Sequence, residues 1–93
     1  MASFNARTRR RLLVVVNPYA TSVDRKMRDL VLAALASRYS VEVADTNAPG
    51  HARELAAAAA LDGTEIVATL GGDGTLNEAA AALSGSGIPL YPL

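Results

Sequence analysis

The stretch LLVVV, residues 12–16, constrains the fold more than any other part of this sequence. Three of its five apolar residues are β-branched valines, which favour extended backbone. An uninterrupted apolar run of this length is typical of a strand buried on both faces, as in a parallel sheet. Asn17 and Pro18 follow directly and predict a break. The stretch therefore predicts a central strand in a sheet that is covered on both sides.

The rest of the chain alternates predicted helices and strands. Apolar residues between Val23 and Leu35 recur at helical spacing, which predicts a helix over residues 22–38 with Thr21 or Ser22 as its N-cap. Five further elements follow: a strand at 40–44, a helix at 51–61, a strand at 65–70, a helix at 75–83 and a strand at 88–93. This alternation favours a parallel sheet with right-handed crossovers. The predicted fold class is α/β, a three-layer Rossmann-like parallel sheet with helices on both faces.

Polar and glycine residues follow three of the predicted strands. They are Asn17-Pro18, residues 45–47 (Asp-Thr-Asn) and residues 71–75 (Gly-Gly-Asp-Gly-Thr). Ligands of open parallel sheets bind beyond the carboxyl ends of the strands. We therefore expect a binding site where these three segments meet.

The basic residues are concentrated near the N-terminus. Eight of the nine lie at or before Arg38, opposed there only by Asp24 and Asp29. We interpret residues 1–11 as a solvated basic arm, with contact to an anionic membrane surface as the alternative. Nucleic-acid binding is disfavoured, because aromatic residues are few and are not interleaved with basic ones. There is no cysteine, which excludes a disulfide framework, a thiolate metal site and a cysteine nucleophile and fits a cytoplasmic location.

The segment GGDGT, residues 71–75, is predicted as a glycine turn that opens a helix, with glycines able to adopt positive φ. Such a turn suits an anion, yet Asp73 carries a negative charge into it. Asp73 is either a helix N-cap or a ligand of Mg²⁺. Thr75 is an alternative cap, since Glu78 lies three residues later and completes a capping box. No Lys or Arg follows Arg53, so a cation for phosphate must come from elsewhere.

The sequence GGDGTLNE, together with VVVNP at residues 14–18 and TNAPGHARELA at residues 46–56, resembles the diacylglycerol kinase catalytic domain family. The Gly-Gly-Asp-Gly core is similar to that of NAD kinases and 6-phosphofructokinases, which implies their related nucleotide-binding fold over residues 12–93. The resemblance implies ATP as the bound nucleotide and Mg²⁺ as the metal. The residues that it implicates in nucleotide binding are Asn17, Thr46, Gly71, Gly72, Asp73, Gly74 and Thr75.

This sequence departs from the family pattern after Asn17-Pro18. Many members continue with a Ser-Gly-Lys-like turn, whereas this chain has YATS at residues 19–22. The hydroxyls of Thr21 and Ser22 could replace that turn at a helix start, so Thr21 is a candidate phosphate ligand. His51 is interpreted as a structural hydrogen-bonding residue, and Glu78 as structural through the capping box.

The resemblance implies a lipid kinase that transfers the γ-phosphoryl group of ATP to a diacylglycerol-like hydroxyl at the membrane surface. Asp73 is the candidate catalytic and metal-binding residue, with metal contact either direct or through water. The chain is expected to be a piece of a longer protein whose second, β-rich domain supplies the lipid site, so alone it should be inactive. The alternatives are an NAD kinase-like or sugar kinase-like domain, or a non-catalytic module that self-associates, for example as a homodimer through the last strand.

Overall fold

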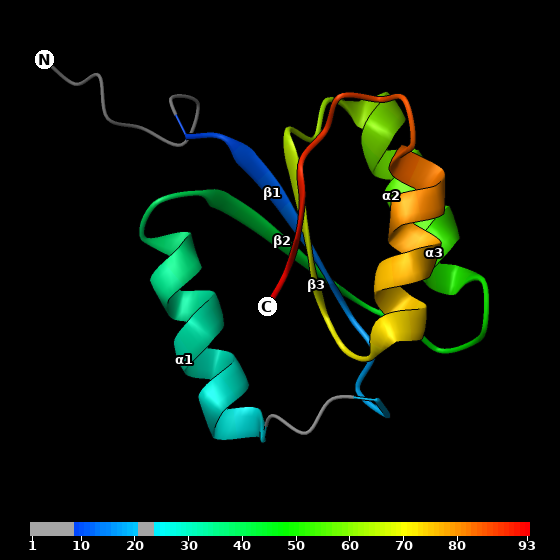
Figure 1. Cartoon of the computed structure of the whole chain (residues 1–93). Coiled ribbons are helices and arrows are strands. Elements are labelled where there is room, and N and C mark those ends of the chain that lie inside the picture. The colour runs from blue at the N-terminus through cyan, green and yellow to red at the C-terminus, as the bar shows by residue number, and fades with distance from the viewer. Residues whose placement is uncertain (1–8, 21–23) are drawn as a thin grey trace, which may run out of the picture.

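The computed structural model describes residues 9–20 and 24–93. Strands and helices alternate along the chain, as the sequence predicts (Figure 1). The elements are β1 (Arg11–Val16), α1 (Arg25–Ala36), β2 (Ser40–Asp45), α2 (His51–Asp62), β3 (Ile66–Leu70), α3 (Asp73–Leu83) and β4 (Leu90–Pro92).

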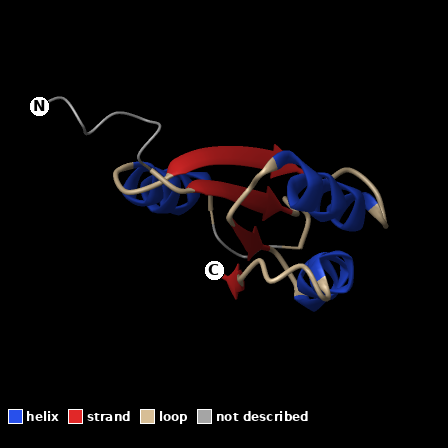
Figure 2. Cartoon of the chain, turned by 90° about the horizontal axis from the view of Figure 1, so that it is seen from above, coloured by secondary structure: helices blue, strands red, loops and turns tan. Residues whose placement is uncertain are grey.

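The four strands form one parallel sheet in the order β2-β1-β3-β4. Helix α1 covers one face, and α2 and α3 lie side by side on the other (Figures 1 and 2). The predicted three-layer α/β fold is therefore confirmed.

Strand β1 is central and is buried along the whole predicted run, since every residue from Leu12 to Val16 is at most 5% exposed. Its side chains alternate between the two faces because successive residues of a strand point in opposite directions. Leu13 and Val15 pack with the helix pair, whereas Leu12, Val14 and Val16 face α1. One strand thus contributes to both halves of the core.

Alanines bring α2 and α3 close to the sheet. The buried residues of α2 are Ala52, Ala56 and Ala59, and Ala79 of α3 is fully buried. Their small side chains allow the two helices to approach each other and the strands closely. Helix α2 ends where predicted, at Gly63, whose φ of 90° is readily adopted by glycine.

Helix α1 begins later than predicted. Its N-cap is Asp24, whose carboxylate accepts a hydrogen bond of 2.8 Å from the N–H of Met27. The predicted cap at Thr21 or Ser22 is wrong, because the carboxylate of Asp24 accepts from the first turn instead. Thr21 and Ser22 themselves lie outside the described residues, so nothing tests Thr21 as a phosphate ligand.

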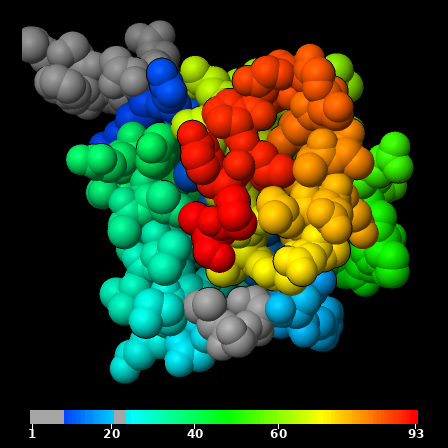
Figure 3. All heavy atoms as spheres, in the orientation of Figure 1, coloured from blue at the N-terminus to red at the C-terminus, as the bar shows by residue number. Residues whose placement is uncertain are grey.

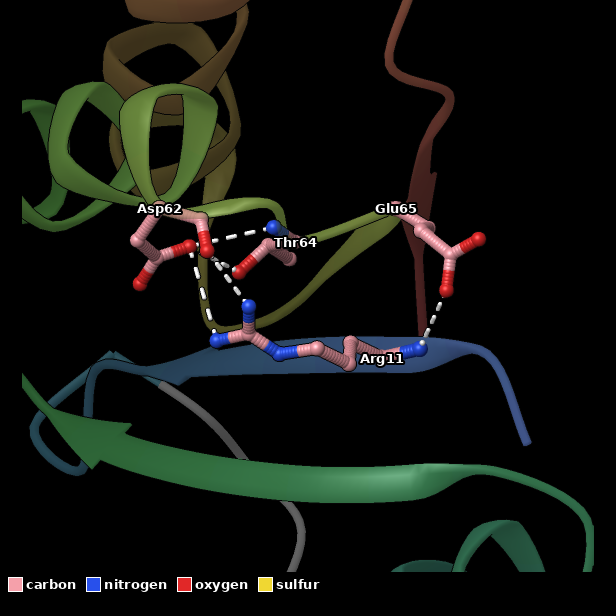
Figure 4. Close-up of polar contacts among 4 residues, drawn as sticks. All are labelled: Arg11, Asp62, Thr64 and Glu65. Carbon is pink, nitrogen blue, oxygen red and sulfur yellow. Dashed lines mark hydrogen bonds and ion pairs between the residues drawn. The ribbon is translucent and has the colours of Figure 1, made fainter. Parts of the chain in front are cut away.

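A polar cluster ties the amino edge of the sheet together (Figure 4). The guanidinium of Arg11 donates to the carbonyl of Asp62 at 2.5 Å and forms an ion pair with its carboxylate at 3.6 Å. The backbone N–H of Arg11 donates to Glu65 at 2.9 Å. Arg11, the last residue of the predicted basic arm, thus belongs to β1 and joins it to the α2–β3 connection.

Helix α1 leaves part of its face of the sheet uncovered. A groove of about 450 Å³ runs between α1 and β4, and its walls include Leu35, Tyr39, Tyr91 and Leu93. The space-filling view shows α1 and β4 on this face of the molecule (Figure 3). No helix among the described residues is long and apolar enough to span a bilayer.

Candidate functional site

A pocket of about 330 Å³ lies at the carboxyl edge of the sheet, where the sequence predicts a site. It is lined by Asn17 and Tyr19 after β1, by residues 46–49 after β2, by Ala52 of α2, and by Gly74, Thr75 and Glu78 of α3. Four of the predicted nucleotide-binding residues therefore meet in one pocket: Asn17, Thr46, Gly74 and Thr75. Gly71 and Gly72 of the adjoining turn and Asp73, the first residue of α3, do not line it.

Asn17 joins the turn after β1 to the end of β3. Its N–H donates to the carbonyl of Leu70 at 2.9 Å, and its side-chain oxygen accepts from the N–H of Tyr19 at 3.0 Å. The second bond is an Asx turn, which fixes the chain just after the strand. Tyr19 remains 89% exposed at the mouth of the pocket.

Gly71 is required by close packing. A Cβ atom there would lie 2.9 Å from Oγ1 of Thr75 and 3.1 Å from Cβ of Asn17. The turn does not use the positive φ that glycine permits, because the glycines with positive φ are Gly50, Gly63, Gly85 and Gly87. The turn is made by extended backbone at Gly72, whose φ is −88° and ψ is −174°.

Helix α3 begins at Asp73, and its N-cap is Gly72, which has no side chain to cap it. The predicted caps at Asp73 and Thr75 are therefore wrong. Thr75 is buried at 5% exposure beneath Gly71, so its hydroxyl does not close the helix end. Within the described residues, the N–H groups of Asp73, Gly74 and Thr75 have no acceptor, and the first helical bond is from Leu76 to Gly72. No described residue therefore caps the N-terminus of α3.

Glu78 closes the end of α2 instead of that of its own helix, so the predicted capping box is also wrong. Its carboxylate accepts from the N–H of Gly50 at 3.1 Å and from that of Arg53 at 3.4 Å. His51 makes a structural hydrogen bond of the predicted kind, since its Nδ1 accepts from the N–H of Asn47 at 3.1 Å. Both contacts fix the segment that forms one wall of the pocket.

Basic residues of α1 lie toward the same edge, because α1 runs antiparallel to the strands (Figure 1). Among them, Arg28 is paired with Asp45 at the end of β2, at 3.0 Å. Within residues 9–20 and 24–93, no group of three or more His, Cys, Asp or Glu residues could hold a metal ion. Asp73, which is exposed in the first turn of α3, is thus a single carboxylate.

Several lining residues were not singled out by the sequence. Tyr19, Asn47, Ala48, Pro49 and Ala52 belong to segments that were noted only as turns or motif matches. For all of them except Ala52, which lies in the predicted helix at 51–61, the available signal was their position in a turn that follows a predicted strand. The contact of Glu78 with α2 had no local signal, because its partners lie 25 and 28 residues away in the chain.

Comparison with known proteins identifies relatives of this chain. The family model described as the diacylglycerol kinase catalytic domain matches residues 11–92. A curated relative from Saccharomyces cerevisiae, sphingoid long chain base kinase 5, is 35% identical over 77 residues, which cover 80% of this chain and 11% of the relative.

Solved structures from Bacillus anthracis strain Sterne that are described as diacylglycerol kinases share the fold. Two of them superimpose with TM-scores of 0.77 and 0.75 at 25% and 26% identity, each covering 90% of this chain. The chain spans 30% and 32% of those two structures.

Proposed function

The chain belongs to the diacylglycerol kinase catalytic domain family, and we propose that the pocket at the carboxyl edge of its sheet binds ATP for phosphoryl transfer to a lipid hydroxyl. The kinase descriptions of its relatives support the class of reaction. The chain spans only part of the length of those relatives, so we propose the lipid acceptor and the complete kinase activity for the longer protein that contains it. The observation that carries it is the pocket beside the open N-terminus of α3.

The phosphates of ATP would lie at the start of α3. Among residues 9–20 and 24–93 nothing accepts from the N–H groups of Gly74 and Thr75, and these groups and the positive end of the helix dipole favour an anion there. A Cβ at Gly74 would meet no atom of the described residues within 4 Å, so this part of the helix leaves room for a ligand beside the pocket. Thr46 and residues 47–49 form the opposite wall and would contact the nucleoside.

Asp73 fits Mg²⁺ that arrives with ATP. A carboxylate oxygen is a hard ligand of the kind this ion prefers, and Mg²⁺ usually completes its shell with phosphate oxygens and water. The single carboxylate suits such a shared ion and not a permanent site. Bound Mg²⁺ would neutralise the negative charges of the phosphates and Asp73. A metal ion would thus supply the positive charge that no Lys or Arg after Arg53 can provide.

The acceptor lipid is proposed to bind outside these residues. Glu78, the glutamate that lines the pocket, uses its carboxylate oxygens on α2 and is not placed to accept a proton from a substrate. We therefore expect the 93-residue chain alone to bind nucleotide weakly and to phosphorylate no lipid. Measurable lipid phosphorylation by this chain alone would contradict that expectation.

Substitution in the complete kinase that contains this domain tests the role of Asp73. We expect Asp73→Asn to lower kcat by roughly 10²-fold, because the shared metal loses its protein ligand. Asp62→Asn, at the opposite edge of the sheet, is the matched control and should leave kcat unchanged. Unchanged turnover in Asp73→Asn would rule out a catalytic role, and phosphorylation of NAD or a sugar without any lipid product would reassign the acceptor.

A further inference from the structure

The N-termini of α2 and α3 both face the pocket, and they are capped differently. Gly50, the N-cap of α2, has a φ of 87° and no side chain of its own to offer. The carboxylate of Glu78 reaches across from α3 and accepts from Gly50 and Arg53. The N-terminus of α3 has no side-chain cap from the part of the chain that the structure describes.

Glu78 accepts both of the hydrogen bonds of a capping box at the N-terminus of α2. In the usual box, one side chain accepts from the third N–H of the helix and another accepts from the N–H of the cap residue. Here Gly50 is the cap residue and Arg53 is the third residue of α2, and one carboxylate accepts from both. It also brings a negative charge to the positive end of the α2 dipole. An anion that approached this end would meet a like charge.

The wall in front of α2 is held by further bonds. The N–H of Thr46 donates to the carbonyl of Val16 at 2.7 Å, and that of Asn47 donates to His51. The next two lining residues, Ala48 and Pro49, are uncharged. This wall has hydroxyl, amide and apolar groups, but its N–H groups at Thr46, Asn47 and Gly50 are already used. It suits an uncharged nucleoside better than a phosphate.

We propose that Glu78 is a positioning residue that fixes the direction of the nucleotide, with its phosphates toward α3 and its nucleoside toward residues 46–49. The inference rests on the proposed nucleotide site. Asp73 also brings a charge to α3, but it makes no hydrogen bond to the helix end within the described residues, so the N–H groups there stay open and Mg²⁺ can offset its charge. Glu78 accepts from two N–H groups of the competing helix end and adds a negative charge there.

Amide chemical shifts of the ¹⁵N-labelled chain provide the test, with magnesium tripolyphosphate and adenosine as separate probes. In the unmodified chain, magnesium tripolyphosphate should shift the amides of residues 72–76, and adenosine should shift those of residues 46–48. In Glu78→Gln the side chain is neutral and retains one acceptor, so one N–H of α2 is released. Tripolyphosphate should then also shift residues 50–53 and bind about two- to fivefold more tightly overall.

Glu54→Gln is the matched control, because Glu54 lies exposed in the first turn of the same helix. It removes the same charge without releasing an N–H and should give no new response at residues 50–53. If the role of Glu78 is purely structural, Glu78→Gln would instead bind both probes more weakly, and that result would overturn the inference.

Measurements on the unmodified chain can overturn the inference even if Glu78→Gln does not fold. Largest tripolyphosphate shifts at residues 50–53 would overturn the inference while leaving a nucleotide site in place. A folded Glu78→Gln variant that behaves like Glu54→Gln would overturn it as well. No shift at either wall with either probe would contradict the nucleotide site itself and the inference with it.

Discussion

At the residue scale, Gly71 controls how closely the end of β3 approaches the turn after β1. Gly71→Ala would place Cβ within 2.9 Å of the buried hydroxyl of Thr75, so it should cost about 1–3 kcal/mol of unfolding free energy. Gly72→Ala is the control, since its Cβ would lie 3.6 Å from Ala20, an ordinary contact. Denaturant unfolding of both variants measures the difference. Equal stability of the two would contradict the packing role.

Substitution of Gly74 should change ligand affinity and folding stability in opposite directions. Gly74→Ala adds a methyl group that meets no atom of residues 9–20 and 24–93 within 4 Å and improves helix propensity, so stability should rise by up to about 1 kcal/mol. The same methyl would occupy the space proposed for phosphate, and Mg-ATP should bind about tenfold more weakly, which corresponds to about 1.4 kcal/mol. Calorimetric titration checks the affinity. Unchanged affinity in a stable variant would move the phosphates away from this residue.

Asp62 makes stability depend on pH. The hydroxyl of Thr64 donates to its carboxylate at 2.7 Å and lowers the pKa of Asp62 from its ordinary value, and the Thr64 N–H and Arg11 lower it further. A carboxyl with a lowered folded-state pKa stabilises the fold above its unfolded pKa, and this contribution is lost as pH falls through the folded value. Unfolding between about pH 5 and 2 should therefore depend less on pH in Asp62→Asn than in the unmodified chain. Identical pH profiles would show that the contact does not influence stability.

At the scale of elements, the alanines of α2 set its distance from the sheet. Ala56 is fully buried, so Ala56→Leu should destabilise the fold by about 1–3 kcal/mol through overpacking. Ala57 is exposed on the same helix, and Ala57→Leu should change stability by no more than about 0.5 kcal/mol. Thermal unfolding of the pair provides the measurement. A tolerated Ala56→Leu would mean that the interface can open without cost.

Helix starts were harder to predict than the elements themselves. The sequence predicted caps at residues 21 or 22 for the first helix and at residues 73 or 75 for the third, but Asp24 caps α1 and Gly72 precedes α3. The reason at α3 is that Thr75 packs beneath Gly71, a contact between the first turn of the helix and the turn before it. Local patterns indicate which residues can cap a helix, and packing decides which of them does.

At the scale of the whole molecule, the fold was predictable because its signals are local. The apolar run at residues 12–16 and the alternation of elements are sufficient to predict a parallel sheet, and GGDGT marks its carboxyl edge. The pocket was predictable only in part. Asn17, Thr46, Gly74 and Thr75 are adjacent to strand ends, whereas Glu78 enters the site through an interaction between two helices. Such contacts depend on the assembled fold.

The most direct measurement of the central proposal is the unfolding temperature of the chain as Mg-ATP is titrated. Ligand that binds only the folded state raises stability by an amount that grows with the logarithm of its concentration. We predict a rise of about 5 °C or more at Mg-ATP well above the dissociation constant, absent with Mg²⁺ alone and smaller in Gly74→Ala. An unfolding temperature that does not move at millimolar Mg-ATP would contradict the assignment of the pocket as a nucleotide site.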